Sequence, residues 1–289
     1  MLNESPPPAR PASTVVLVRD TSSRPEILMV RRTRAASFFG GAYVFPGGRV
    51  DAADQDAGLI ARCDGVETVA ARLPDLSAAE AAAYAVAALR ELFEEAGVLV
   101  ARDAQGRPVR TDTDRARERF DAHRLALCGG QQNLGAMLEA EGLRLALDHL
   151  QPFAHWITPV NEPKRFDTRF FVARMPDGQQ PMHDAGETTD TQWVAPGEAL
   201  ERFARDEIVL APPTWSTLHD LARLKGADAM LAWAATQPMP AIEPRPHEQD
   251  GRKVLLLPGD PLNPADWAPP IDHTRFVLDH TGRWRAENA

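Results

Sequence analysis

Apolar residues gather in short stretches of strand length along the chain. Residues 13–19 (STVVLVR) and 26–32 (EILMVRR) are rich in β-branched and large apolar side chains. This pattern favours strands, and the polar residues 20–25 between them predict an antiparallel pair. Residues 153–160 and 165–174 have a similar character and predict two further strands. These four segments together predict a β-sheet.

One segment between these strands carries helix signals at both of its ends. Ser77 and Glu80 are spaced as a capping box, in which each side chain bonds a free backbone N–H at the start of a helix. An alanine-rich run follows as far as Ala96, and Gly97 is placed to end the helix. The sequence therefore predicts a helix that begins after Ser77 and ends at Ala96.

The last turns of this helix carry three carboxylates, Glu91, Glu94 and Glu95. Residues three and four apart are neighbours on a helix, so the three side chains share one face and repel one another. They also lie at the negative end of the helix dipole, which favours cations. Stability alone does not explain this arrangement, whereas a divalent cation such as Mg²⁺ takes carboxylate oxygens as ligands. We therefore predict a metal site on this face.

Paired glycines mark the loop over residues 38–48, at Gly40-Gly41 and at Gly47-Gly48. Glycine permits backbone dihedral angles that other residues avoid, and it lets the backbone approach another group closely. The loop is therefore either a plain tight turn or a point of close approach, and the pattern alone leaves both interpretations open.

The rest of the chain is predicted to be mostly helical until a proline-rich end. Apolar residues at helical spacing predict helices over residues 112–127, 133–141, 196–205 and 212–225, and residues 55–62 are a candidate short helix. Residues 192–195 predict one more strand. Beyond residue 237 the chain is rich in proline, and residues 253–258 and 275–280 are predicted as isolated strands.

Composition narrows the class of protein. The chain has 289 residues, 44% of them hydrophobic, and a formal net charge of −9. The hydrophobic content is ordinary for a globular protein, and the acidity argues against a general nucleic-acid binder. Cys63 and Cys128 match no metal-site spacing and are interpreted as buried thiols in a reducing compartment. No apolar run has the length of a membrane span, and no secretory signal pattern is seen, so we expect a cytoplasmic protein without a membrane partner.

Residues 90–98 (RELFEEAGV) resemble the second half of the Nudix box, G-x5-E-x7-R-E-U-x-E-E-x-G-U, in which U is apolar. Every fixed position of that half is matched. Residues 45–54 (FPGGRVDAAD) are similar to the first half, with Gly48 as the box glycine and Asp54 where the family has glutamate. A long spacer, residues 55–89, separates the two halves. This interrupted box resembles the acyl-CoA diphosphatase branch of the Nudix hydrolases.

The resemblance implies an α+β Nudix fold, a mixed β-sheet sandwiched between helices with helical insertions and a C-terminal extension. The Nudix domain is expected over residues 13–236, after a disordered tail at residues 1–12. It would contain an insertion in the box at residues 55–76 and a helical insertion at about residues 104–147, which either caps the substrate pocket or only adds bulk. Residues 237–289 are expected to be the extension that packs on the domain.

A metal site of defined composition is also implied by the resemblance. Glu91, Glu95 and the backbone carbonyl of Gly47 are expected to bind Mg²⁺ or Mn²⁺. Glu94 is either a third ligand or the residue that positions the attacking water. Arg90 is expected to orient a glutamate through a charge-assisted hydrogen bond rather than to contact substrate.

Further catalytic and substrate-binding candidates lie elsewhere in the chain. Glu187 is the candidate for an additional catalytic glutamate and Asp190 is its reserve, although the acidic loop that carries them could equally be a plain solvated loop. Arg32, Arg165 and Arg169 are candidates for contacts with substrate phosphates, and pairing with nearby acids is the alternative. Arg32 lies in a half-matched CoA-binding pattern in which a serine replaces the internal arginine.

Three functions remain open at this point. The first is metal-dependent hydrolysis of CoA or acyl-CoA, small-molecule nucleoside diphosphate derivatives, to 3′,5′-ADP and (acyl-)4′-phosphopantetheine. ADP-ribose or a nucleotide sugar is the alternative substrate. The third is a Nudix-fold module that binds a nucleotide without cleaving it. The complete glutamate set favours an enzyme, because a sensor needs no water-activating cluster. No basic DNA-reading helix is recognisable, which disfavours a transcriptional sensor.

Overall fold

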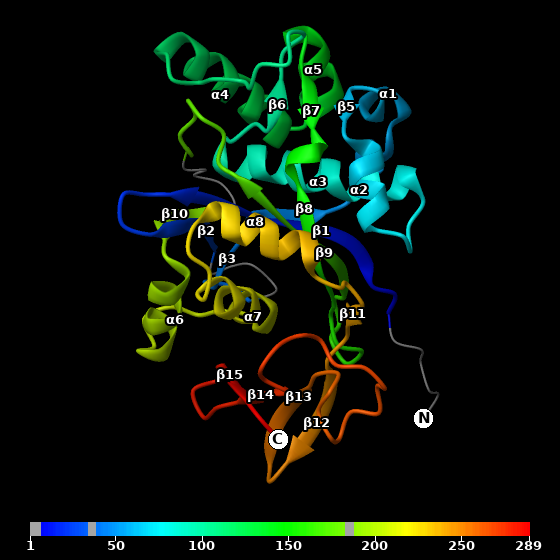
Figure 1. Cartoon of the computed structure of the whole chain (residues 1–289), viewed down its shortest axis with the longest axis vertical. Coiled ribbons are helices and arrows are strands. Elements are labelled where there is room, and N and C mark those ends of the chain that lie inside the picture. Colours follow the sequence, from blue (N-terminus) through cyan, green and yellow to red (C-terminus); the bar gives the residue numbers. More distant parts are fainter. Residues whose placement is uncertain (1–6, 34–38, 183–187) are drawn as a thin grey trace.

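A mixed β-sheet forms the centre of the molecule. The computed structural model describes residues 7–33, 39–182 and 188–289 (Figure 1). The strands of the central sheet are β1 (Arg10–Asp20), β2 (Pro25–Arg32), β3 (Tyr43–Val44), β4 (Gly47–Arg49), β8 (Gln151–Ile157), β9 (Phe166–Arg174), β10 (Thr188–Val194) and β11 (Ala241–Ile242). The order is β10-β2-β1-β9-β8-β11, with β3 beside β2 and β4 beside β1. Strands β1 and β2 are antiparallel, as predicted, while β1 and β9 are parallel.

Helices cover both faces of this sheet, which explains why its strands are almost continuously apolar. Figure 1 shows one group of helices above the sheet and another below it. Along β1, Val15 and Leu17 face the first group, while Val16 and Val18 face the second. The helices are α1 (Ala57–Ile60), α2 (Val66–Arg72), α3 (Ala78–Ala96), α4 (Asp114–Cys128), α5 (Leu134–Glu141), α6 (Pro196–Ala204), α7 (Pro212–Leu221) and α8 (Ala227–Thr236). The predicted arrangement of a mixed sheet between helices is thus confirmed.

Helix α3 has the ends that the sequence predicts. The Ser77 hydroxyl accepts a hydrogen bond from the backbone N–H of Glu80, and the Glu80 carboxylate accepts one from the N–H of Ser77. At the other end Gly97 has a φ of +66°, the left-handed conformation that glycine adopts without strain. Every residue from Ala81 to Leu89 is buried, so this part of the helix is covered on all sides, and it packs against β1 and α2. This packing fixes the direction in which its last turns point.

The segments before and after α3 meet in a small sheet. Strands β5 (Cys63–Asp64), β6 (Ala101–Arg102) and β7 (Arg144–Ala146) make a three-stranded sheet, in which β5 and β7 are parallel. The Arg144 guanidinium contacts the Asp64 carboxylate at 2.6 Å across this pairing. We call residues 55–76 and 101–147 the cap. Its halves are far apart in the sequence, and α3 runs between them.

The proline-rich extension folds as a second sheet, so its strands are not isolated as predicted. Strands β12 (Arg245–Gln249), β13 (Arg252–Leu256), β14 (Arg275–Leu278) and β15 (Trp284–Glu287) are antiparallel neighbours in that order. We call these four strands the C-terminal sheet. Leu255, Leu257 and Phe276 pack in the same apolar cluster as Leu218 of α7, so the extension is joined to the rest of the molecule by a shared core.

Other local predictions differ from the structure at identifiable points. The helix predicted over residues 212–225 ends at Leu221, and a separate α8 follows Gly226, whose φ is +106°. The candidate helix at residues 55–62 is split between a 3₁₀ turn (Ala52–Gln55) and the short α1. Cys63 is buried as predicted, but Cys128 is exposed, because it ends α4 at the surface.

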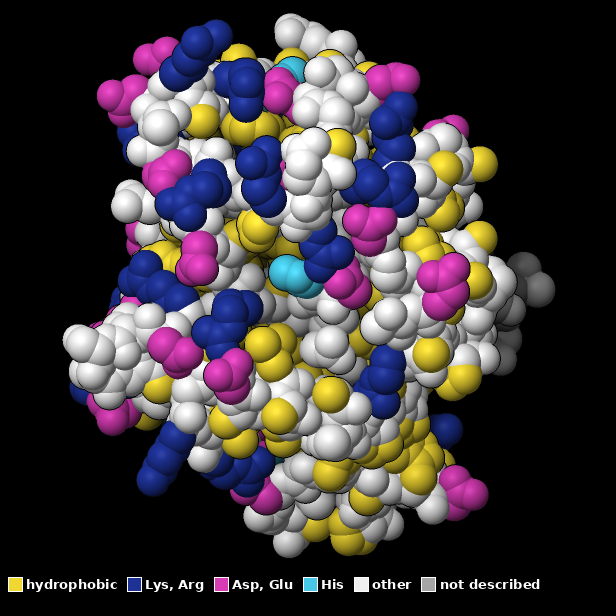
Figure 2. Space-filling view, turned by 45° about the horizontal axis from the view of Figure 1, so that its top comes forward, with side chains coloured by type: hydrophobic (Ala, Val, Ile, Leu, Met, Phe, Trp, Pro, Cys, Tyr) yellow, Lys and Arg dark blue, Asp and Glu magenta, His cyan; other side chains and the backbone are white. Residues whose placement is uncertain are grey.

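The surface carries both signs of charge. Figure 2 shows acidic and basic side chains interspersed over one face of the molecule. None of the helices in the described ranges is both long and apolar enough to cross a lipid bilayer.

Candidate active site

The glutamates of α3 open onto a large cleft. Glu91, Glu94 and Glu95 all line it, together with Gly47 and Gly48 of β4. The Glu91 and Glu94 side chains are 14% and 21% exposed, so they are held by the protein yet reachable from solvent. The backbone N–H of Gly47 donates a hydrogen bond to Glu95 Oε2 at 3.1 Å. This bond links the two halves of the interrupted box directly.

Arg90 holds the acidic residues in place through four contacts. Its Nε and one terminal nitrogen donate to the two carboxylate oxygens of Asp54 at 2.8 and 3.0 Å. The other terminal nitrogen donates to Glu91 at 2.9 Å and to Glu94 at 3.0 Å. A further bond reaches the backbone carbonyl of Arg49 at 2.9 Å. Arg90 therefore orients two glutamates at once and ties α3 to the loop after β4.

Asp54 has no solvent exposure and faces Arg90. Its second carboxylate oxygen also accepts a hydrogen bond from the backbone N–H of Asp51 at 2.8 Å. With both oxygens used in this way, the shorter aspartate serves as the anchor of Arg90. The role of Asp54 stayed open in the sequence analysis because its side chain is one methylene shorter than that of the family's glutamate.

The paired glycines of β4 lie at points of close approach. A Cβ atom at Gly48 would lie 2.2 Å from Glu91 Oε1, so the Glu91 carboxylate packs directly on this backbone. A Cβ atom at Gly47 would lie 2.4 Å from the backbone carbonyl oxygen of Ser13 on β1. Of the two interpretations of the loop, the structure supports close approach at this glycine pair.

The charge balance of the site suits a cation. Five carboxylates line this part of the cleft, and they outnumber the neighbouring basic side chains of Arg49 and Arg90. The carboxylates are those of Asp51, Asp54, Glu91, Glu94 and Glu95. Burial raises the pKa of Glu94, the charge of Arg90 opposes that rise, and the charges of Asp54 and Asp51 add to it. Burial would lower the pKa of Arg90, but the hydrogen bonds that it donates to Asp54 and the charges of Glu91, Asp54 and Glu94 raise it overall. A hard divalent cation would relieve this excess of negative charge.

The cleft is walled by three parts of the chain. Its volume is about 1650 Å³. Leu59, Leu127 and Leu134 of the cap line one side of it. Leu255 and Trp284 of the C-terminal sheet line another side. The strand that carries Leu255 was predicted, but β15, which carries Trp284, has little apolar pattern and was not.

The three candidate arginines have different positions. Arg32 lines the cleft. Arg165 also lines it, but its guanidinium already bonds Glu243 at 2.5 Å and the backbone carbonyl oxygens of Thr158 and Pro7. Arg169 is 3% exposed, binds Asp75 and is not among the described residues that line the cleft. The structure therefore does not bring Arg169 together with the glutamates, because its face of β9 points into the protein.

The predicted additional acid is only partly described. Glu187 lies outside the described residues. Asp190, its reserve, lies on β10 and accepts a hydrogen bond of 2.7 Å from the Tyr43 hydroxyl. It is not among the described residues that line the cleft.

Comparisons of this chain with known proteins all point to the same family. The family model described as NUDT19 Nudix domain matches residues 67–224. Human acyl-coenzyme A diphosphatase NUDT19 is 29% identical over 82% of this chain and 72% of its own length, and the chicken protein of that name is 29% identical over 83% and 73%. The crystal structure of a Nudix hydrolase from Alicyclobacillus acidocaldarius is 29% identical, covers 80% of this chain and 99% of its own, and superposes with a TM-score of 0.66.

Proposed function

The chain belongs to the NUDT19 Nudix domain family, and we propose that it hydrolyses the diphosphate bond of CoA or an acyl-CoA. The products are 3′,5′-ADP and 4′-phosphopantetheine or its acyl derivative. The observation that carries the proposal is the glutamate face of α3, anchored by Arg90 and Asp54, at the edge of a long cleft. The names of the human and chicken relatives support the choice of substrate.

The size of the cleft supports a substrate with two large ends. Pockets for small ligands usually have volumes of about 300–1,000 Å³, and this cleft exceeds that range at about 1650 Å³. Arg10, Arg32 and Lys164 line it and suit the phosphates of a nucleotide. Leu255 and Trp284 of the C-terminal sheet supply apolar surface that suits an acyl-pantetheine arm.

The residues of the site have distinct roles in this proposal. Glu91 and Glu95 hold Mg²⁺ or Mn²⁺ with the help of the Gly47 carbonyl, and Glu94 either completes the ligand set or positions the attacking water. When bound, the cation neutralises diphosphate charge and makes water more acidic. Arg90 keeps the carboxylates of Glu91 and Glu94 in place, since both accept hydrogen bonds from one of its nitrogens.

A substrate panel tests the proposal. Purified full-length protein is incubated with CoA, acetyl-CoA, ADP-ribose, NADH and a dinucleoside polyphosphate, each with Mg²⁺ and with Mn²⁺, and the products are identified by mass. We expect 3′,5′-ADP from CoA and acetyl-CoA at the highest kcat/KM. Preferential cleavage of ADP-ribose would overturn the substrate assignment, and no cleavage of any compound with either metal would overturn the enzymatic one.

Substitutions of the two glycines of β4 should separate catalysis from stability. In Gly48→Ala the new methyl group displaces the flexible Glu91 carboxylate, so we expect kcat to fall at least about tenfold, because small misplacements at a reacting centre are costly. In Gly47→Ala the methyl group meets the backbone of β1, which cannot swing away. We therefore expect a loss of about 1–3 kcal/mol in unfolding free energy.

Steady-state kinetics and urea unfolding of both variants measure these effects. The two variants are matched controls for each other, because they add the same methyl group to neighbouring residues. A Gly48→Ala protein with unchanged kcat would show that the close approach of Glu91 has no bearing on the reaction.

A further inference from the structure

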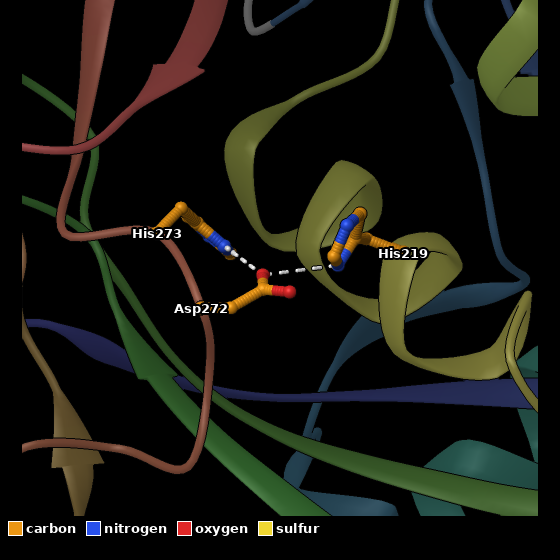
Figure 3. A group of neighbouring side chains, drawn as sticks. All are labelled: His219, Asp272 and His273. Carbon is orange, nitrogen blue, oxygen red and sulfur yellow. Dashed lines mark ion pairs between the residues drawn. The ribbon is translucent and has the colours of Figure 1, made fainter.

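Three potential ligand side chains converge outside the catalytic cleft. His219 comes from α7, and Asp272 and His273 come from the segment that precedes β14; Figure 3 shows all three pointing toward one another. His219 Nδ1 lies 3.4 Å from Asp272 Oδ1, and His273 Nδ1 lies 3.7 Å from the same oxygen. The three ligand atoms all lie within 4.8 Å of one another. This group is absent from the described cleft lining.

Both Nδ1 atoms are buried and lack a hydrogen-bond partner among the described residues. Such orphaned groups are rare in native proteins, and each costs about 1–3 kcal/mol. Zinc binds imidazole nitrogen and carboxylate oxygen at about 2.0–2.2 Å, so ligand atoms around a tetrahedral ion lie roughly 3.3–3.5 Å apart. The separations of 3.4 and 3.7 Å are too long for good hydrogen bonds but close to this ligand spacing.

The surroundings orient both imidazole rings for ligation. His273 Nε2 lies 2.9 Å from the Ser216 hydroxyl, and when this nitrogen donates to Ser216 the Nδ1 lone pair faces Asp272. Metal-binding histidines commonly donate their second ring N–H to a polar neighbour in this way. The His219 ring stacks on Trp215, with centroids 4.9 Å apart.

A nucleophilic triad of Ser216, His273 and Asp272 is the competing interpretation. Ser216 is only 3% exposed and is not among the described residues of the cleft, so a substrate could not reach its hydroxyl. The distance of 3.7 Å between His273 and Asp272 is too long for the hydrogen bond that orients a triad histidine. A triad also leaves the second imidazole, His219, without a role.

Asp272 can bind a metal through one carboxylate oxygen while the other oxygen keeps its ion pair with Arg223. The Arg223 guanidinium lies 3.1 Å from Oδ2, whereas both histidines face Oδ1. The side chains of His219 and Asp272 are 28% and 56% exposed, so water can enter as a fourth ligand. Arg223 is also paired with the Asp220 carboxylate at 2.5 Å, which offsets its positive charge beside the site.

We propose that His219, Asp272 and His273 form a divalent transition-metal site, best suited to zinc, that clamps the C-terminal sheet to α7. Two imidazoles and one carboxylate favour zinc over Mg²⁺, which prefers oxygen ligands alone. Both clamped parts border the catalytic cleft, because Thr214 of α7 lines it together with Leu255 and Trp284 of the C-terminal sheet. The metal therefore fixes the relative position of two cleft walls.

Zinc binding to the full chain tests this site. Protein without a histidine tag is stripped with EDTA, returned to excess MgCl₂ so that Mg²⁺ competes at the glutamates, and titrated with ZnCl₂. We expect one zinc ion per chain to remain after desalting and the melting temperature to rise by about 5 °C. Replacement of zinc by Co²⁺ should give the intense visible absorption of a four-coordinate cobalt site.

Matched variants assign the bound ion to these residues. His219→Gln and Asp272→Asn should each lose the retained zinc and the thermal shift, whereas His247→Gln, which changes an exposed histidine on β12, should keep both. Asp272 is the safest substitution for folding because its side chain is more than half exposed. Failure of the parent protein to retain zinc, or equal retention by all variants, would overturn the proposal.

Discussion

Replacing Glu94 by glutamine is expected to lower kcat at least about a hundredfold while the fold survives. Glutamine has the same shape but no negative charge, so it can neither bind a cation strongly nor attract a proton from water. Glu94 accepts a hydrogen bond from Arg90 at 3.0 Å, and the amide oxygen of glutamine can still accept it. We therefore expect the melting temperature to stay within about 2 °C of the parent value, since a surface-accessible isosteric change costs little.

The measurement is kcat with CoA at saturating Mg²⁺, beside a thermal melt of each protein. Glu118→Gln is a matched control, because Glu118 is an exposed glutamate on α4 away from the cleft lining, and it should keep full activity. Full activity of Glu94→Gln would show that the reaction needs Glu94 neither as a metal ligand nor as the residue that positions the attacking water.

Replacing Asp54 by asparagine is expected to destabilise the protein by about 3 kcal/mol, because it leaves a buried guanidinium short of its main partner. Asp54 is fully buried and accepts two hydrogen bonds from Arg90. Asparagine keeps one acceptor oxygen but turns an amide N–H₂ toward the donors of Arg90. Arg90 keeps its hydrogen bonds to Glu91 and Glu94 in this variant. We therefore expect the loss to lie at the lower end of the range for broken buried ion pairs. Because Arg90 also holds those two glutamates, kcat should fall as well.

Urea unfolding measures this loss. Asp114→Asn provides the contrast: Asp114 pairs with Arg117 on α4 at 3.0 Å, but its side chain is 92% exposed. Exposed pairs contribute about 0–1 kcal/mol, so this variant should unfold at nearly the parent urea concentration. Equal shifts in the two variants would mean that burial of Asp54 does not decide the energetics of its pair.

Helix α3 was predictable because its signals are local. The capping box at Ser77 and Glu80, the terminal Gly97 and the spacing of the glutamates depend on residues within one helix. Strands β1, β2, β8 and β9 were predicted for the same reason, since short apolar runs need a buried sheet, whereas the very short strands β3, β4 and β11 were not predicted. Regions with weak local patterns were missed, such as α8 beyond Gly226 and the polar strand β12.

Arg165 and Arg169 show why substrate contacts are harder to predict. Arg165 lies just before β9 and Arg169 lies four residues further on, so alternation places both on one face and does not say what covers that face at either position. In the structure Arg169 is buried against Asp75, and Arg165 lines the cleft while its donors are taken up by Glu243 and two backbone carbonyls. Apart from Thr158, which lies seven residues before Arg165, the partners of both arginines come from distant parts of the chain.

The sequence by itself determined that Glu91, Glu94 and Glu95 share one face of a helix, because residues three and four apart are helical neighbours. Tertiary structure decided everything that depends on distant segments meeting. It brought Asp54 to Arg90 across a spacer of 35 residues. It also joined the halves of the cap through the pairing of β5 with β7, and it placed His219 beside Asp272 and His273. Such contacts depend on how whole layers pack, and no local pattern records that packing.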